Sequence, residues 1–153
     1  MTAGTLDSRG NAVARVVFTG LPARYDQLAY LLSFGQDRRW RRATVDRVVA
    51  AAPRSVLDVA TGPAGVALAI ARRSPASIVG VDLNLPMLAQ GQRNVRAAER
   101  DAQVRLLAAR AEQLPFDDAS FDAVSFAYLL RYVDDPAATV AEMARVLQPG
   151  GTL

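Results

Sequence analysis

The stretch SVLDVATGPAG, residues 55–65, decides the fold. It opens with a run of apolar residues as long as a buried strand, interrupted by an acid, Asp58. A turn of small residues follows, and such a turn lets the backbone approach a neighbour or a ligand closely. The pattern predicts a buried strand over 55–60, a tight turn, and a helix that begins at Gly65.

Strand and helix patterns alternate along the rest of the chain. Residues 13–52 place apolar side chains at helical spacing, and Pro53 ends that pattern. Because short loops join alternating strands and helices, we expect an α/β fold, a parallel sheet with helices on both faces. The remaining predicted strands are 77–83 and 103–110, a fourth that the stretch 121–130 begins as, and a fifth opened by Thr152 and Leu153 after a PGG turn. The predicted helices are 65–74, 85–100 with Asn84 as N-cap, and 135–148 with Asp135 as N-cap.

The composition limits the chemistry of this one-domain chain. It has 153 residues with no cysteine and no histidine, which excludes disulfides, thiolate nucleophiles and imidazole bases, and we expect no metal site. The net charge of +3 is mild, so we expect no nucleic-acid partner. No apolar run reaches the roughly 18 residues that a membrane span needs. Residues 1–12, which we expect to be disordered, lack the apolar core of a secretory signal, and we expect a cytoplasmic protein.

Four arginines surround a single tryptophan in the predicted N-terminal helices. Arg38, Arg39, Arg41 and Arg42 flank Trp40. A solvated helix face is the favoured interpretation of the arginines, and contact with an anion or a membrane surface is the alternative. For Trp40, packing in the core is favoured over membrane contact.

Two acids stand at the ends of the first two predicted strands. In open α/β sheets, ligands bind beyond the carboxyl ends of the strands. A carboxylate at Asp58 suits a ligand that carries positive charge, and a carboxylate at Asp82 can accept hydrogen bonds from both hydroxyls of a ribose. The alternative role of Asp82 is a helix cap, for which Asn84 competes. A dinucleotide-dependent oxidoreductase is disfavoured, because the G-x-G-x-x-G spacing is absent and Asp58 would oppose a pyrophosphate.

Four segments resemble, in order and spacing, the motifs of class I S-adenosylmethionine-dependent methyltransferases. They are VLDVATGPAG, VGVDLNLPML, AEQLPFDDASFDAV and ARVLQPGG. Upstream, residues 13–40 are similar to the N-terminal signature of the ubiquinone/menaquinone biosynthesis C-methyltransferases, and LLRYVDD (129–135) resembles the Leu-Arg-Asn-Val segment of that family.

The resemblance covers residues 13–153 and implies a Rossmann-like fold. Residues 13–52 would form N-terminal helices and 53–153 the cofactor-binding half of the methyltransferase domain. The family's sheet has seven strands, with strands one and four central and strand five beyond strand four. The sheet would therefore be incomplete after the start of strand five, and we expect an N-terminal fragment whose open sheet edge favours self-association.

The resemblance implies that S-adenosylmethionine is the cofactor. Asp58, Ala60 and Gly62 would line its methionine end, and Asp82 would bind the ribose hydroxyls. The remaining implied cofactor residues are Pro63 in place of a threonine, Leu83 and Met87 on the adenine faces, Arg110 and Ala111 at the adenine edge, Ala127 after strand four, and Tyr25 as a cap.

Some residues depart from the family pattern. Arg110 stands where the family has an acid or an amide, and guanidinium donates hydrogen bonds but accepts none. Only backbone groups could then read the adenine amino group. Ala64 replaces a third glycine and would narrow the approach of the backbone. In the upstream signature, Ala29 and Asp37 replace the usual asparagine and histidine.

The reaction implied is methyl transfer to a ring carbon of a demethylmenaquinol-type quinol. Such an acceptor carries an isoprenoid tail, which implies peripheral contact with the inner face of the membrane. Arg131 matches an arginine near the acceptor and would stabilise the developing phenolate, or it is a surface cation. Tyr128 and Tyr132 are interpreted as packing residues. The alternatives are a methyltransferase with another small-molecule acceptor and a fragment that binds the cofactor without catalysis.

Overall fold

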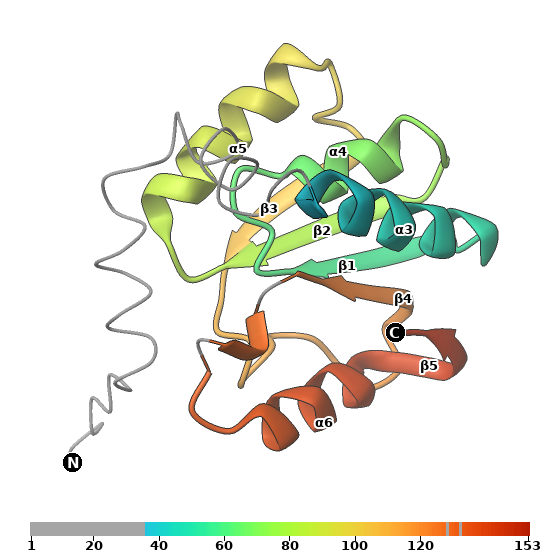
Figure 1. Cartoon of the computed structure of the whole chain (residues 1–153), viewed down its shortest axis with the longest axis vertical. Coiled ribbons are helices and arrows are strands. Elements are labelled where there is room, and N and C mark those ends of the chain that lie inside the picture. The colour runs from blue at the N-terminus through green and yellow to red at the C-terminus, as the bar shows by residue number, and fades with distance from the viewer. Residues whose placement is uncertain (1–35, 128, 132) are drawn as a thin grey trace.

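A computed structural model describes residues 36–127, 129–131 and 133–153 (Figure 1). The first described element is helix α3 (Gln36–Ala50), which ends just before Pro53, as the sequence predicts. The predictions for residues 1–35, including the role of Tyr25, lie outside the described residues.

A parallel sheet forms the centre of the described chain. Its strands are β1 (Ser55–Val59), β2 (Ser77–Asp82), β3 (Val104–Ala108), β4 (Phe121–Phe126) and β5 (Leu147–Thr152). They lie in the order β3-β2-β1-β4-β5, and every neighbouring pair is parallel. The α/β prediction and the expected strand order are thus confirmed. The chain reverses its direction across the sheet between β1 and β4, which opens the crevice where such sheets bind ligands.

Helices cover both faces of the sheet. Helices α3, α4 (Gly65–Ala71) and α5 (Leu85–Ala97) lie on one face, and α6 (Pro136–Val146) lies on the other (Figure 1). Successive residues of β1 point to opposite faces. Val56 therefore joins the core under α3 and α4, while Leu57 joins the core against α6. Because β1 is buried on both sides from Val56 to Val59, that part of its sequence is apolar except at Asp58.

The two predicted N-caps are confirmed. The side chain of Asn84 accepts a hydrogen bond from the backbone N–H of Met87 at 3.0 Å. That of Asp135 accepts one from the N–H of Ala138 at 2.9 Å. Each cap satisfies a backbone donor that the first turn of a helix leaves without a partner.

The loop between β3 and β4 is fixed by one arginine of α6. The guanidinium of Arg145 donates to the carbonyl oxygens of Phe116, at 2.9 Å, and Leu114, at 3.2 Å. It also pairs with Glu142, at 2.8 Å, and with Asp118, at 2.7 Å. The LPFDDAS loop is therefore held against α6, and it brings the chain back to the sheet at β4.

The last strand departs from the prediction. The PGG segment, predicted as a turn, lies inside β5, and the preceding helix ends at Val146. β5 pairs with β4 only at Leu147, opposite Phe121, and at Thr152, opposite Ala123, with an irregularity between them. A bulge accommodates the proline, which lacks a donor, and Gly150 with its positive φ of 80°. Pairing with β4 therefore overrides the local turn signal.

The strand predicted to begin at residue 121 is confirmed; it ends at Phe126 and is followed by a short 3-10 helix, η1 (Leu129–Arg131). One other expectation is corrected. Trp40 is 54 % exposed, so the core role predicted for it is wrong. It lies on α3, in a stretch where neighbouring arginines keep the helix surface polar. Among the described residues, no helix combines the length and the hydrophobicity that crossing a bilayer requires.

We predict that Gly91→Ala destabilises the fold. A Cβ at Gly91 of α5 would lie 2.8 Å from Cδ1 of Leu106 and 3.1 Å from the carbonyl oxygen of Gly62, in the turn after β1. The gain in helix propensity is about 1 kcal/mol, whereas overpacking costs about 1–3 kcal/mol. Urea unfolding should therefore show a net loss of stability. Ala89→Gly, at an exposed position of α5, measures the propensity term alone. If Gly91→Ala raised the stability by as much as Ala89→Gly lowered it, the turn would have moved away from the added Cβ at no cost in free energy.

Candidate functional site

The carboxylate of Asp82 joins three parts of the site. Asp82 ends β2, and its Oδ2 accepts the N–H of Gly62 at 2.8 Å while its Oδ1 accepts the N–H of Asn84 at 2.8 Å. Burial raises the pKa of this carboxyl, and the backbone N–H groups partly oppose that rise. The side chain is half-buried, and each oxygen has a second lone pair for a ligand. Because Asn84 is the N-cap of α5, the helix-cap alternative for Asp82 is not what the structure shows.

The turn after β1 is strained and open on one side. Ala60, Gly62 and Ala64 all have positive φ, at 57°, 55° and 66°. For the two alanines this left-handed conformation costs about 1–2 kcal/mol each. A Cβ built on Gly62 would meet nothing within 4 Å, so the backbone there faces open space. Ala64 is fully buried in the core beside α4, so its methyl group is directed into the core.

Asp58 lies beneath this turn, buried between two hydroxyls. Its Oδ2 accepts a hydrogen bond from Oγ of Thr61 at 2.7 Å, and its Oδ1 accepts one from Oγ of Ser125 at 2.8 Å. Burial raises the pKa of Asp58 to about 6, and the two hydroxyls oppose that rise. The nearby charge of Asp82 raises the pKa slightly further. With 3 % exposure, the carboxylate braces the turn, and its contact with the cofactor stays a prediction.

The predicted adenine residues follow the ends of β2 and β3. Asp82 is opposite Ala108, and the N–H of Ala109 donates to the carbonyl oxygen of Asp82 at 3.1 Å. Arg110 and Ala111 therefore follow at the same edge of the sheet as Leu83. Nε of Arg110 lies 3.8 Å from a carboxylate oxygen of Glu112. Of the other predicted adenine residues, Ala111 and Met87 are buried and Leu83 is half-buried.

The remaining predicted residues are placed less completely. The buried Pro63 lies in the turn, where its carbonyl oxygen accepts a hydrogen bond from the side chain of Asn94 at 2.9 Å. Ala127 directly follows β4 and is half-buried. The backbone of Arg131 closes η1, and its side chain lies outside the described part of the structure.

Sequence reasoning missed two of the side chains that hold the turn. They are Ser125, opposite Asp58 on the neighbouring strand, and Asn94 of α5. The only signal for Ser125 was a polar residue in an apolar strand pattern, and its partner depends on the strand register. Asn94 is 31 positions away from the carbonyl that it contacts, so no local pattern reveals the contact.

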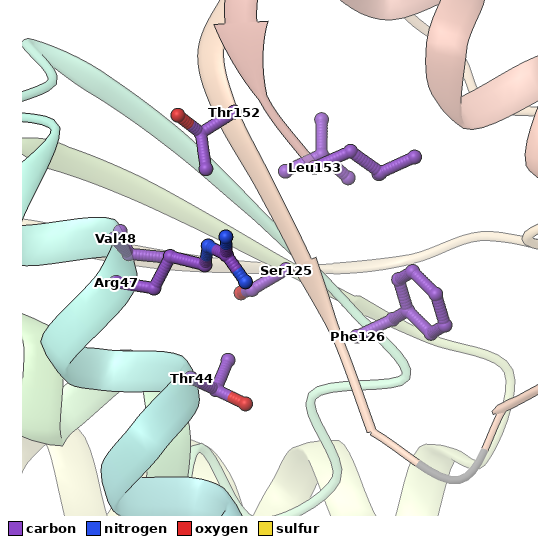
Figure 2. A pocket seen from close by; sticks show the side chains of 8 residues that line it. Thr44, Arg47, Val48, Ser125, Phe126, Thr152 and Leu153 are labelled. Atoms are coloured by element: carbon purple, nitrogen blue, oxygen red, sulfur yellow. The ribbon is translucent and has the colours of Figure 1, made fainter.

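A pocket of about 200 Å³ lies beside β4, on the side of α3 (Figure 2). Figure 2 shows Ser125 directed toward α3 and Phe126 directed to the other side of β4. The pocket contains none of the predicted cofactor residues. Its lining residues are Thr44, Arg47 and Val48 of α3, Val124, Ser125 and Phe126 of β4, and Thr152 and Leu153.

Comparison with known proteins fits this geometry. The family model described as the ubiE/COQ5 methyltransferase family matches residues 6–153. The chain belongs to this family. It is 46 % identical over 138 residues to a demethylmenaquinone methyltransferase of Thermus thermophilus, covering 90 % of this chain and 62 % of the relative. It is 41 % identical over 150 residues to a ubiquinone/menaquinone biosynthesis C-methyltransferase of a Geobacter species, covering 97 % of this chain and 63 % of the relative.

A solved structure supports the fold of this ubiE/COQ5 family member. A putative methyltransferase of Bacillus halodurans superposes with a TM-score of 0.63 and 32 % identity, over 71 % of this chain and 47 % of that one. The Rossmann-like class I methyltransferase fold and the resemblance read from the sequence are thus confirmed. The chain spans less than two thirds of the length of the two curated relatives.

We predict that Asp58→Asn removes a pH dependence of stability. Because the folded pKa of Asp58 is raised from 3.8 to about 6, folding favours the protonated form. That contribution is complete below about pH 4 and is lost as the pH rises through about 6. The wild type should therefore lose up to about 3 kcal/mol relative to Asp58→Asn across this window.

Urea unfolding of both proteins at several pH values between about 4 and 7.5 measures this difference. Asp117→Asn, at an exposed position in the loop before β4, is the matched control for removing one carboxylate. A wild-type curve parallel to that of Asp58→Asn at every pH would show that the burial of Asp58 does not disfavour its charge.

Proposed function

We propose that this chain is the cofactor-binding part of an S-adenosylmethionine-dependent C-methyltransferase of quinone biosynthesis. The acceptor we propose is a demethylmenaquinol-type quinol. Family membership supports the class of enzyme, and the names of the two curated relatives support the acceptor. Since the chain spans 62 % and 63 % of those relatives, activity and acceptor remain proposals for this chain.

The observation that carries the proposal is the carboxylate of Asp82 beside the open turn at Gly62. A ribose needs acceptors for two hydroxyls, and both oxygens of Asp82 have a lone pair left after their backbone bonds. The open space over Gly62 lets a ligand approach the backbone. The residues present therefore fit a nucleoside with a diol, which S-adenosylmethionine has.

The same turn disfavours a dinucleotide. Helix α4 begins directly after the turn, and Asp58, one of the two acids of the site, lies beneath the turn. Both Asp58 and Asp82 would repel a pyrophosphate, because like charges in a partly buried site repel each other. An oxidoreductase of the dinucleotide type thus remains disfavoured.

When bound, S-adenosylmethionine supplies a methyl group activated by a sulfonium. In this proposal, Asp82 orients the ribose, the turn at residues 60–64 receives the methionine part, and Leu83 and Met87 pack on the adenine. Asp58 contributes by fixing the turn and by placing negative charge near the cationic part of the ligand. Positioning of the two reactants would supply much of the rate enhancement.

Arg131 is proposed to act on the acceptor. A quinol ring becomes a better nucleophile as its hydroxyl loses a proton, and a guanidinium can stabilise the resulting phenolate. Arg131 would not take the proton, because arginine stays protonated in proteins. With no histidine in the chain, a carboxylate or a water is the proposed proton acceptor.

Peripheral contact with the inner face of a membrane remains part of the proposal. The tail of the proposed acceptor is lipid-soluble, and α3 presents an exposed Trp40 beside Arg39 and Arg42, which are also exposed. Tryptophan and arginine together suit a membrane–water interface. A cytoplasmic location and self-association through the open edge of the sheet stay predictions.

We predict that the chain binds S-adenosylhomocysteine, and that Asp82→Ala weakens binding about 100-fold. Hydrogen bonds to a charged group contribute about 1.5–3 kcal/mol, and tenfold in affinity corresponds to about 1.4 kcal/mol. Titration calorimetry measures the affinity, with Asp101→Ala at an exposed position of the same charge type as control. NAD⁺ serves as a second ligand that should not bind.

Different outcomes separate the candidate functions. Binding together with transfer of a labelled methyl group to a naphthoquinol that lacks the ring methyl would support the enzyme. Binding without transfer to that or other small acceptors would support the non-catalytic alternative. Equal affinities for wild type and Asp82→Ala in folded samples would contradict the site itself.

A further inference from the structure

The carboxylate of Asp58 connects two hydroxyls from different parts of the chain. Ser125 belongs to β4 and lies opposite Asp58 in the strand register, and Thr61 belongs to the turn. The two hydroxyl–carboxylate bonds, at 2.8 Å and 2.7 Å, have the usual length of an O–H···O hydrogen bond. The three side chains thus form a continuous link from the centre of the sheet to the turn.

This link is shielded from water. Asp58 and Ser125 are each 3 % exposed, and Thr61 is 7 % exposed. Water therefore cannot easily replace either hydroxyl as a donor to the carboxylate. Removal of one hydroxyl leaves a buried acceptor without its partner, which is far more costly than the same loss at a surface. The side chain of Asp58 must then move, or the turn that Thr61 anchors must move.

The turn needs such an anchor. Ala60 and Ala64 both have positive φ, a conformation that persists only where the surroundings enforce it. Three bonds fix the turn from the side of β2 and from within: Thr61 N–H to Val81 O at 3.0 Å, Gly62 N–H to Asp82 at 2.8 Å, and Ala64 N–H to Thr61 O at 3.0 Å. On the side of β1 and β4, the turn is held by a side-chain hydrogen bond, which Thr61 donates to Asp58.

We propose that Ser125 is a positioning residue of the site, whose hydroxyl acts through Asp58 and Thr61 to hold the turn at residues 60–64 in its ligand-receiving shape. This inference rests on the proposed function for the identity of the ligand. Ser125 itself is too deeply buried to meet a ligand in the open space over Gly62. Its role is therefore indirect, through the shape of the backbone that the ligand meets.

The same two strands carry a matched pair at their opposite end. Asp122 of β4 accepts a hydrogen bond from Oγ of Ser55 of β1 at 3.2 Å, and from the N–H groups of Ser55 and Arg54. Ser55→Ala therefore also removes a serine–carboxylate bond between β1 and β4, far along the strands from the turn. It is the control for a general loosening of this strand pair.

The test compares Ser125→Ala, Ser125→Thr and Ser55→Ala with the wild type by amide hydrogen exchange in the absence of ligand. Ser125→Ala should accelerate exchange at Thr61, Gly62 and Ala64 by about tenfold or more, and leave the interior of β2 and β3 unchanged. Ser125→Thr keeps the hydroxyl, and Ser125 lines a pocket of about 200 Å³. It should restore slow exchange, and Ser55→Ala should not alter the turn.

Affinity for S-adenosylhomocysteine is the second readout. It should fall about tenfold in Ser125→Ala, recover in Ser125→Thr, and stay unchanged in Ser55→Ala. Unchanged exchange at the turn in Ser125→Ala would overturn the inference. So would faster exchange at the turn with unchanged affinity, or equal acceleration throughout the sheet.

The two readouts separate this inference from the proposed function. If the wild type fails to bind S-adenosylhomocysteine, the proposed function fails for this chain, and the exchange rates at the turn still decide whether Ser125 holds it. If the wild type binds and exchange at the turn does not respond to Ser125→Ala, the inference fails and the proposed function stands.

Discussion

The shape of the site depends on two carboxylates that hold one turn from two sides. Asp82 accepts the N–H of Gly62, and Asp58 accepts the hydroxyl of Thr61 beneath it. Between them, the backbone takes positive φ angles at two alanines, which cost free energy that the surroundings must offset. Burying the charged form of each acid also costs free energy, and for that reason burial raises the pKa of both. The two buried carboxylates thus hold the strained turn at the place where a ligand would bind.

The sheet makes this arrangement possible. β1 lies between β2 and β4, so its carboxyl end has a strand on each side from which polar groups can reach the turn. β2 contributes Asp82 and the carbonyl of Val81, and β4 contributes Ser125. Helices on both faces bury β1 from Val56 to Val59, which keeps water away from Asp58. Family membership is consistent with a cofactor site at this edge, and the acceptor remains a separate question because much of the relatives' length lies beyond this alignment.

Much of the fold could be read from local patterns. The strands β1 and β2, the caps at Asn84 and Asp135, and the α/β class were all predicted correctly, because each has a signal within a few residues. The errors came where distant contacts overrode that signal. The PGG segment looks like a turn but lies within β5, since β4 provides a pairing edge at Phe121 and Ala123. Trp40 is apolar at helical spacing and is nevertheless exposed.

By itself, the sequence determined the class of fold, the family and the positions of the two acids, because strand ends and small-residue turns are local features. Only the tertiary structure decided what each acid does. It placed Asp58 out of reach of water between two hydroxyls, and Asp82 at the open side of the turn with lone pairs to spare. The reason is strand register: Ser125 is 67 positions from Asp58, and only the pairing of β1 with β4 brings their side chains within hydrogen-bond distance.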